Sequence, residues 1–140
     1  MSQRLILLCD DNEDNRVVFT AVLEHAGYAV LVAENGAEGV EQAQEFTPSL
    51  ILLDLMMPGL DGWEVVALLK AHPVTEGIPV VAVTADVLAS KRALKEAGFC
   101  ALVPKPVLPK QLLQAVEQCL EEKSRRGDAP IEWMEVRVGL

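Results

Sequence analysis

Short runs of apolar residues recur along the chain, and most of them end in polar or turn-forming residues. Runs of this length, bounded by turn signals, are typical of strands buried on both faces of a sheet. The central run leads to Asp54 and is followed by the turn residues Pro58, Gly59 and Asp61-Gly62. The pattern predicts five strands, over Leu5–Cys9, Tyr28–Ala33, Ser49–Leu53, Val80–Val83 and Cys100–Val103.

Segments with apolar residues at helical spacing separate these strands. The first predicted helix starts near Asp14 or Asn15, either of which can cap it, and Gly27 ends it. Its apolar stripe is expected at Val17, Val18, Ala21, Val22 and Ala26. The other helices are predicted over Ala37–Phe46, Trp63–Ala71 (with Val65, Val66, Leu68 and Leu69 inside or half inside), Val87–Ala97 (capped by Asp86) and Pro109–Glu122. Alternation of strands and helices predicts βαβ units and a parallel sheet with right-handed crossovers.

Length and composition limit the classes of protein. The 140 residues, half of them apolar, suit one domain with one core. The net charge of −9 argues against direct nucleic-acid binding, which needs basic patches. No segment approaches the length of a membrane span, and the start has no signal-peptide shape. Cys9, Cys100 and Cys119 lack Cys-x-x-Cys spacing, which favours free thiols in a reducing cytoplasm.

The chain end differs from the rest in composition. We expect a domain over residues 1–123 and a linker with a short tail over residues 124–140. Ser124–Pro130 is linker-like, whereas Ile131–Val138 has a strand-like composition. The tail is too short for a DNA-binding output domain. It could fold back on the domain, join a partner or a second copy, or be disordered.

Polar residues stand directly after four of the predicted strands. They are Asp10-Asp11 after the first, Asp54 after the third, Thr84-Ala85-Asp86 after the fourth, and Pro104-Lys105-Pro106 after the fifth. The carboxyl ends of parallel strands share one edge of the sheet, where ligands bind. Carboxylates held close together repel one another unless a cation joins them, and their hard oxygens suit Mg²⁺ or Mn²⁺. Asp10, Asp11 and Asp54 therefore predict a divalent metal.

This set of motifs, in this order, resembles the receiver domain of two-component response regulators, in particular the stand-alone, chemotaxis-regulator-like members. The resemblance covers roughly Leu5 to Leu120. It rests on Asp10-Asp11, Asp54-x-x-Met57-Pro58-x-x-Asp61-Gly62, Thr84-Ala85 and Lys105-Pro106. It implies a flavodoxin-like (βα)5 fold, a doubly wound parallel five-stranded sheet in the order 2-1-3-4-5.

The resemblance also implies a role for each residue. Asp54 would accept a phosphoryl group as an aspartyl phosphate, a reaction open to a carboxylate nucleophile. Lys105 and Thr84 would contact the phosphoryl oxygens. The metal would bind Asp11, Asp54 and the backbone carbonyl of Met56 directly, and Asp10 mainly through water. The remaining roles are tuning of phosphorylation rates by Met56 and Asp86, and loop geometry set by Met57, Pro58, Gly62 and a cis Lys105–Pro106 bond.

One position departs from the family pattern. Family members carry Tyr or Phe three residues before the lysine, where the ring moves together with the threonine as a switch. Here that position is Leu102, and Phe99 is out of register. The phosphorylation chemistry is expected to survive, but the usual coupling from Thr84 to the output surface is in doubt. That surface would comprise Val87–Ala97, Cys100–Val103 and the last helix.

The leading hypothesis is a cytoplasmic signalling switch that receives its phosphoryl group from a sensor histidine kinase or a phosphotransfer protein. It would signal to a downstream protein or form a homodimer, and would catalyse only its own phosphorylation and dephosphorylation. The alternative is a phosphate-independent interaction module. A phosphatase would need a second acid where Met56 stands, and the acidic first loop would repel a flavin phosphate. No role is evident for His25 or His72.

Overall fold

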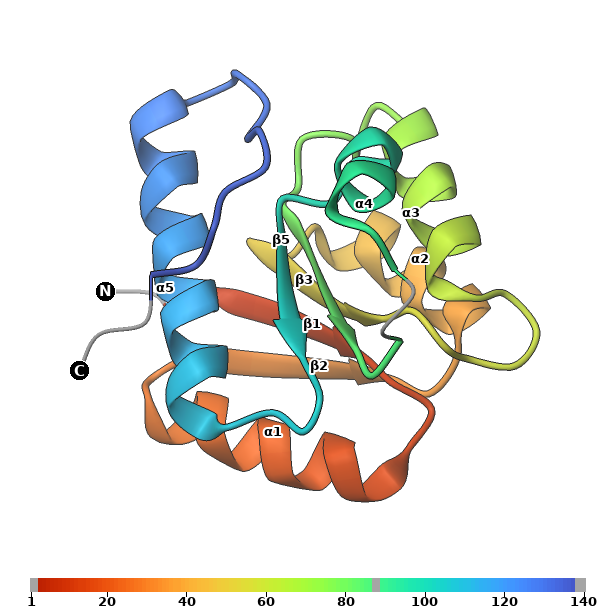
Figure 1. Ribbon diagram of the computed structural model, residues 1–140, viewed down its shortest axis with the longest axis vertical. Helices are drawn as coiled ribbons and strands as arrows, with labels where there is room; N and C mark the ends of the chain where they lie inside the picture. The colour runs from red at the N-terminus through yellow and green to blue at the C-terminus, as the bar shows by residue number, and fades with distance from the viewer. Residues whose placement is uncertain (1–2, 87–88, 138–140) are drawn as a thin grey trace.

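The computed structural model describes residues 3–86 and 89–137, which form one parallel sheet flanked by helices (Figure 1). The strand order is β2-β1-β3-β4-β5, as predicted. The strands are β1 (Leu5–Cys9), β2 (Ala29–Ala33), β3 (Leu50–Asp54), β4 (Val80–Thr84) and β5 (Ala101–Pro104). The helices are α1 (Glu13–His25), α2 (Gly36–Phe46), α3 (Gly62–Ala71), α4 (Lys91–Ala97) and α5 (Pro109–Arg126).

The two faces of the sheet are covered by different helices. Side chains alternate along each strand, so Ile6 and Leu8 face α1 and α5, whereas Leu7 and Cys9 belong to the cluster that includes α2, α3 and α4. The three central strands are apolar and buried almost throughout. This explains why apolar runs located them correctly in the sequence.

Helix α1 differs from its prediction at its start and on its buried face. It is capped by Asn12, whose side chain accepts a hydrogen bond from the Asn15 backbone at 2.9 Å, so the expected caps Asp14 and Asn15 lie inside the helix. The buried residues are Phe19 and Leu23, whereas Val17 is 63% exposed. Of the expected stripe only Val22 is half-buried. In α3, Leu68 is likewise exposed, which also contradicts its prediction.

Helix α4 is shorter than predicted. It begins at Lys91 and is capped by Ser90, whose side chain accepts a hydrogen bond from Ala93. The expected cap, Asp86, instead donates its backbone N–H to Thr84 Oγ1 at 2.9 Å, so it belongs to the turn after β4. The expected first helical residues, 87 and 88, lie outside the described residues. A local side-chain cap at Ser90 thus sets the start of the helix.

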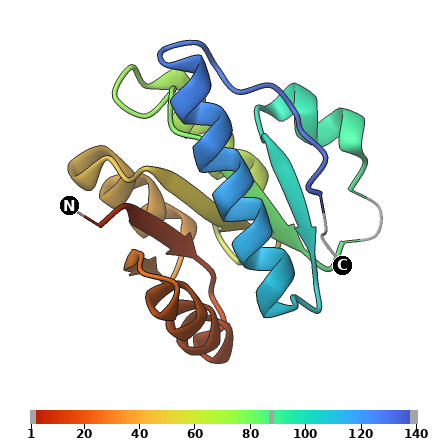
Figure 2. The same ribbon diagram turned by 90° about the vertical axis from the view of Figure 1, so that its left-hand side faces the viewer.

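The chain end packs back on the domain. Helix α5 runs to Arg126, past the predicted end at Glu122, and Glu122 pairs with Arg125 and Arg126 in its last turn. Residues 128–137 then return between α5 and α4 beside β5 (Figure 2). Residues 131–137 form no strand, contrary to their composition, and Val138 lies outside the described residues. Of the three fates considered for the tail, folding back is the one observed.

Within the described part of the chain, no helix has the length and apolar character needed to cross a membrane.

Candidate functional site

Four strand ends bring the polar residues together at one edge of the sheet. Asp10 follows β1, Asp54 ends β3, Thr84 ends β4, and Lys105 follows β5. Parallel pairing sets their common level, because Asp54 lies opposite Val83 and Thr84 lies opposite Pro104. Residues up to 95 positions apart in sequence therefore share one site.

Asp10 is held in place by the start of α1. Its side chain is only 2% exposed. Its carboxylate accepts hydrogen bonds from the Asn12 backbone at 2.9 Å and from Asn15 Nδ2 at 3.2 Å. Arg16 donates to the Asp10 backbone carbonyl at 2.9 Å. The sequence reasoning missed the roles of Asn15 and Arg16. Their spacing from Asp10 provides the signal, because the first helical turn lies back over the preceding loop.

Asp54 is nearly as buried, with 5% of its surface exposed. Its Oδ1 accepts the Met56 backbone N–H at 3.0 Å, and its Oδ2 accepts a hydrogen bond from Lys105 Nζ at 3.1 Å. Burial raises the pKa of Asp54 above its ordinary value, and the bonds from Met56 and Lys105 oppose that shift. The carboxylate is thus poorly solvated, with its charge balanced in part by a single ammonium.

Lys105 links two carboxylates. Its Nζ lies 3.1 Å from Asp54 Oδ2 and 3.5 Å from Asp10 Oδ2. Its backbone N–H donates to the Thr84 carbonyl at 2.9 Å, which ties the loop to the end of β4. The Lys105–Pro106 bond is cis, so that prediction is confirmed. The ammonium is thereby brought to the carboxylate cluster from a fixed backbone position.

The three acids form a group that fits a divalent cation. One carboxylate oxygen from each of Asp10, Asp11 and Asp54 lies within 4.8 Å of the others. Asp11 is exposed, whereas the other two are buried, so the group opens to solvent on one side. Hard oxygen donors on one side and water on the other suit Mg²⁺, which keeps several waters when bound. The donor set therefore fits the predicted metal.

Thr84 contributes a buried hydroxyl. Its oxygen accepts the Asp86 backbone N–H, which leaves the hydroxyl hydrogen to be donated elsewhere. Asp86 is partly buried beside it. Leu102 is half-buried and packs on the face of the sheet that carries α3 and α4. The predicted switch pair is thus a buried hydroxyl and an aliphatic side chain.

The loop after β3 depends on Gly62. A Cβ there would lie 2.6 Å from the Asp54 carbonyl oxygen and 2.6 Å from Leu55 Cα, closer than real contacts allow. The Gly62 N–H donates to the Leu55 carbonyl at 3.0 Å, and Asp61 caps α3 through a capping box. Met56 is 63% exposed, whereas Met57 is buried against Cys9. Gly62 thus lets the loop return closely over the strand end that carries Asp54.

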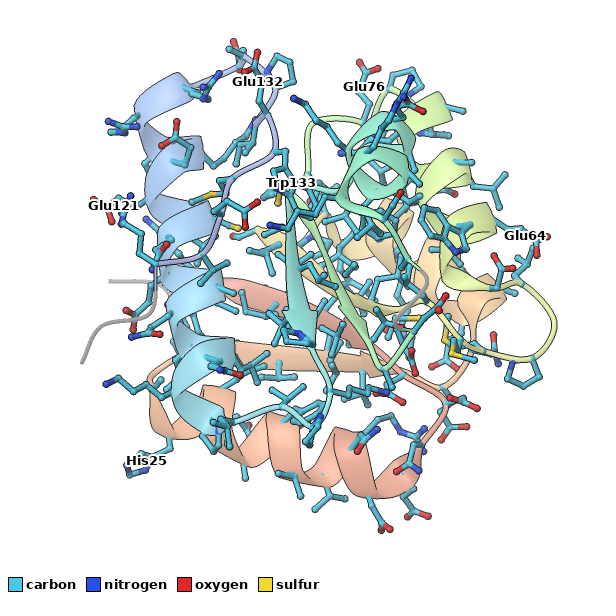
Figure 3. All side chains as sticks on the ribbon, in the orientation of Figure 1. His25, Glu64, Glu76, Glu121, Glu132 and Trp133 are labelled. Carbon is cyan, nitrogen blue, oxygen red and sulfur yellow. The ribbon has the colours of Figure 1, made fainter. Side chains whose placement is uncertain are left out.

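The other residues singled out in the sequence lie away from this site. His25 is exposed near the end of α1 (Figure 3). His72 caps the carboxyl end of α3, and its Nδ1 accepts the Val74 backbone N–H. Cys9, Cys100 and Cys119 are free and buried, as expected from their spacing. Burial raises the pKa of Cys9 to about 12, so its thiol stays protonated.

A doubly wound parallel sheet with acids and a lysine at its carboxyl edge has close matches among known proteins. The family model described as the response regulator receiver domain matches residues 6–117. Protein PilH of Pseudomonas aeruginosa is 37% identical over 116 residues, covering 82% of this chain and 96% of PilH. The polar-differentiation response regulator DivK of Brucella anthropi is 32% identical over 125 residues, covering 89% of this chain and 97% of DivK.

Solved structures agree with these matches. The chemotaxis protein CheY4 of Vibrio cholerae superposes with a TM-score of 0.78 at 27% identity, covering 84% of this chain and 98% of CheY4. The receiver domain of sensor histidine kinase PA1611 from Pseudomonas aeruginosa superposes with a TM-score of 0.79 at 29% identity, covering 86% and 99%. That structure has a magnesium ion coordinated in its active-site cleft. The present chain belongs to the receiver-domain family of response regulators, which are phosphorylation-dependent signalling switches.

Proposed function

We propose that Asp54 is the phosphoryl acceptor of this switch. A carboxylate oxygen of Asp54 attacks phosphorus, a new O–P bond forms, and the bond from phosphorus to the donor breaks. With a phosphohistidine donor the P–N bond breaks and the imidazole leaves. The observation that carries the proposal is the position of Lys105 Nζ, within hydrogen-bond reach of Asp54 and next to Asp10. An ammonium there can neutralise charge on a phosphoryl oxygen.

The other residues at the sheet edge have supporting roles. The Thr84 hydroxyl donates to a phosphoryl oxygen, and Asn15 together with the Asn12 backbone holds the Asp10 carboxylate in place. Asp11, Asp54 and the Met56 carbonyl would hold Mg²⁺ or Mn²⁺ directly, and Asp10 mainly through water. Bound there, the metal would neutralise carboxylate and phosphoryl charge. Met56 lies beside Asp54 and Asp86 lies beside Thr84. Both would therefore tune the rates of phosphorylation and dephosphorylation.

The proposed donor is a phosphohistidine on a sensor kinase or a phosphotransfer protein. The proposed output is a contact with a downstream protein or a second copy, without direct nucleic-acid or membrane contact. The chain would catalyse only its own phosphorylation and dephosphorylation. The proposal includes a cytoplasmic location, with which three free thiols agree.

The test is the intact mass of the protein after incubation with acetyl phosphate, with and without Mg²⁺. We expect one phosphoryl group on the wild type only with metal, and none on Asp54→Asn. Asp14→Asn removes an exposed acid from the first turn of α1 and serves as the matched control. If acetyl phosphate does not phosphorylate the wild type and no beryllofluoride complex forms, the phosphate-independent interaction module becomes the better hypothesis.

A further inference from the structure

The chain covers one of its own surfaces. We call residues 130–137 the strap. It lies over the surface formed by α4, β5 and α5, which we call the α4–β5–α5 surface (Figures 1 and 2). Ile131, Met134 and Val136 of the strap pack against the core on the α5 side, whereas Trp133 packs against the core on the α4 side. The strap therefore bridges the two layers across the β5 edge of the sheet.

Polar contacts fix the register of the strap. The Met134 backbone N–H donates to the Cys100 carbonyl, just before β5, at 2.8 Å. The Gln118 side chain on α5 donates to the Arg137 carbonyl at 2.6 Å and accepts the Arg137 N–H at 2.8 Å. Lys91 at the start of α4 pairs with Glu135 at 2.8 Å. Helix α4, the residue before β5 and helix α5 thus each provide a polar contact to the strap.

The apolar and acidic side chains of the strap differ in burial. Ile131, Trp133, Met134 and Val136 are half-buried, whereas Glu132 and Glu135 are exposed. Figure 3 shows Trp133 between the returning chain and α4, with Glu132 at the outer margin of the molecule. An extended segment with apolar residues inward and acids outward resembles a bound peptide more than a loop. Docked peptides likewise place apolar anchors inward, although residues 131–137 form no strand beside β5.

The attachment is weak enough to be reversible. Among the described residues, the bond from Met134 to Cys100 is the one backbone–backbone hydrogen bond between the strap and the sheet region. The Lys91–Glu135 pair is about two-thirds exposed on both sides, and such surface pairs add little stability. The four inward side chains of the strap are half-buried, none of them fully, and such segments open locally below the global unfolding free energy. The strap can therefore leave without unfolding the domain.

A chain of contacts joins the strap to the candidate phosphorylation site. The Thr84 hydroxyl oxygen accepts the Asp86 N–H, and the Asp86 carbonyl accepts the Ala89 N–H at 3.3 Å. Ala89 directly precedes Ser90 and Lys91, at the cap and first turn of α4, and Lys91 pairs with Glu135 of the strap. A shift of Thr84 toward a phosphoryl group would therefore move the anchor of the strap on α4.

We propose that the strap is an autoinhibitory occupant of the α4–β5–α5 surface, which the resemblance already implies as the output surface. It lies in the groove that takes an extended apolar segment of a partner protein, and it competes with the partner until phosphorylation of Asp54 loosens it. The last clause rests on the proposed function, whereas the groove and its occupant stand on the strap contacts alone. A tethered competitor lowers the apparent affinity for a partner in trans, because its effective concentration is high.

The groove is tested with a fluorescent synthetic peptide of residues 128–137 and the full-length protein. Trp133→Ser/Met134→Ser removes two inward side chains, and Glu132→Gln is the matched exposed control. We expect the double variant to bind the peptide about tenfold more tightly than the wild type, and the control to behave as the wild type. Gln118→Ala, which loses both bonds to Arg137, is a milder second variant with the same expected direction. If both loosened proteins fold normally and bind no better than the wild type, the groove is refuted.

The coupling is tested in the wild type with Mg²⁺ and beryllofluoride. We expect about tenfold tighter peptide binding and faster hydrogen exchange at the Met134 amide. If intact mass shows phosphorylation of Asp54 but neither readout changes, the coupling is refuted and the proposed function stands. If neither phosphorylation nor a beryllofluoride complex occurs, the proposed function fails, and the strap variants still decide whether the groove exists.

Discussion

The Lys105 ammonium lies 3.1 Å from Asp54 Oδ2, although 51 residues separate the two in sequence. The same nitrogen lies 3.5 Å from Asp10 Oδ2. One ammonium therefore pairs with two buried carboxylates at the point where four strands end. This relationship connects the fold to the proposed chemistry, and it makes Lys105 the first residue to alter.

Replacing Lys105 by Gln removes the ammonium but keeps a long polar side chain. We expect phosphorylation by acetyl phosphate to slow by about a hundredfold, because loss of one preorganised charge-stabilising group costs of that order. The rate is measured as the increase of the phosphorylated species in intact-mass time courses. Lys110→Gln, at an exposed position at the start of α5, is the control. Equal rates for the Lys105 variant and the wild type would contradict the proposed role.

Mg²⁺ should stabilise the folded protein without any phosphoryl donor. A ligand present at 100 times its Kd stabilises the native state by about 2.7 kcal/mol, which is measurable as a rise in Tm. Asp11→Asn should weaken this metal-dependent rise, because it removes one carboxylate of the group. Asp14→Asn should retain it, since Asp14 is not a member of that group. A full rise in the Asp11 variant would place the metal elsewhere.

Asp54→Asn should stabilise the metal-free protein at neutral pH. Burial raises the pKa of Asp54 in the folded state, so between the unfolded and folded pKa values the native state binds more protons. Stability from this group is therefore present at low pH and is lost as pH rises through the folded pKa. The advantage of the Asn variant should shrink as pH falls toward about 4, the ordinary carboxyl range. Urea unfolding at several pH values measures it, and an advantage that grows on acidification would have the wrong sign.

Gly62→Ala should destabilise the fold by about 1–3 kcal/mol, because the new methyl group meets backbone atoms of Asp54 and Leu55 that cannot move aside. Gly77→Ala is the matched control, since its added Cβ would meet only the Lys123 ammonium at 3.7 Å. The control should stay within about 0.5 kcal/mol of the wild type. Urea unfolding gives both free energies. Similar losses in the two variants would show that the backbone around Gly62 relaxes to accept the added methyl group.

The three thiols should resist alkylation in the native protein. Burial raises the pKa of Cys9 to about 12, and the bond shared with Cys100 together with burial raises the pKa of Cys119. The same bond lowers the pKa of Cys100, so burial alone protects this thiol, which is 1% exposed. Buried thiols are inert because the reagent cannot reach them. Intact mass after iodoacetamide treatment should show no adduct in buffer and three in guanidinium. Rapid labelling of the folded protein would indicate local opening near a cysteine, and Cys→Ser variants would identify which one.

Much of the site could be predicted from the sequence because it lies at strand ends. Parallel strands place their carboxyl ends at one edge, so Asp10, Asp54, Thr84 and Lys105 had to meet if the strands were correctly located. The apolar runs located them, because the central strands are buried on both faces. The group of three acids that could hold a metal ion follows from the same rule, because Asp11 stands beside Asp10 in the same loop.

The buried faces of the helices, the residues that cap them and the path of the strap depended on tertiary contacts. Val17 and Phe19 are both apolar, but only Phe19 faces the sheet, because packing against neighbouring elements sets the rotation of α1. Ser90 rather than Asp86 caps α4, because the helix begins at Lys91 and the Ser90 hydroxyl oxygen accepts the Ala93 N–H.

The sequence by itself determined the order of the strands along the chain and which side chains reach their shared edge, because both follow from local patterns of burial and turn residues. Only the tertiary structure decided that residues 130–137 cover β5. Their composition suits a strand, a linker or a partner contact equally. The bond from Met134 to Cys100 joins positions that are 34 residues apart in the numbering, and no local pattern encodes such a contact.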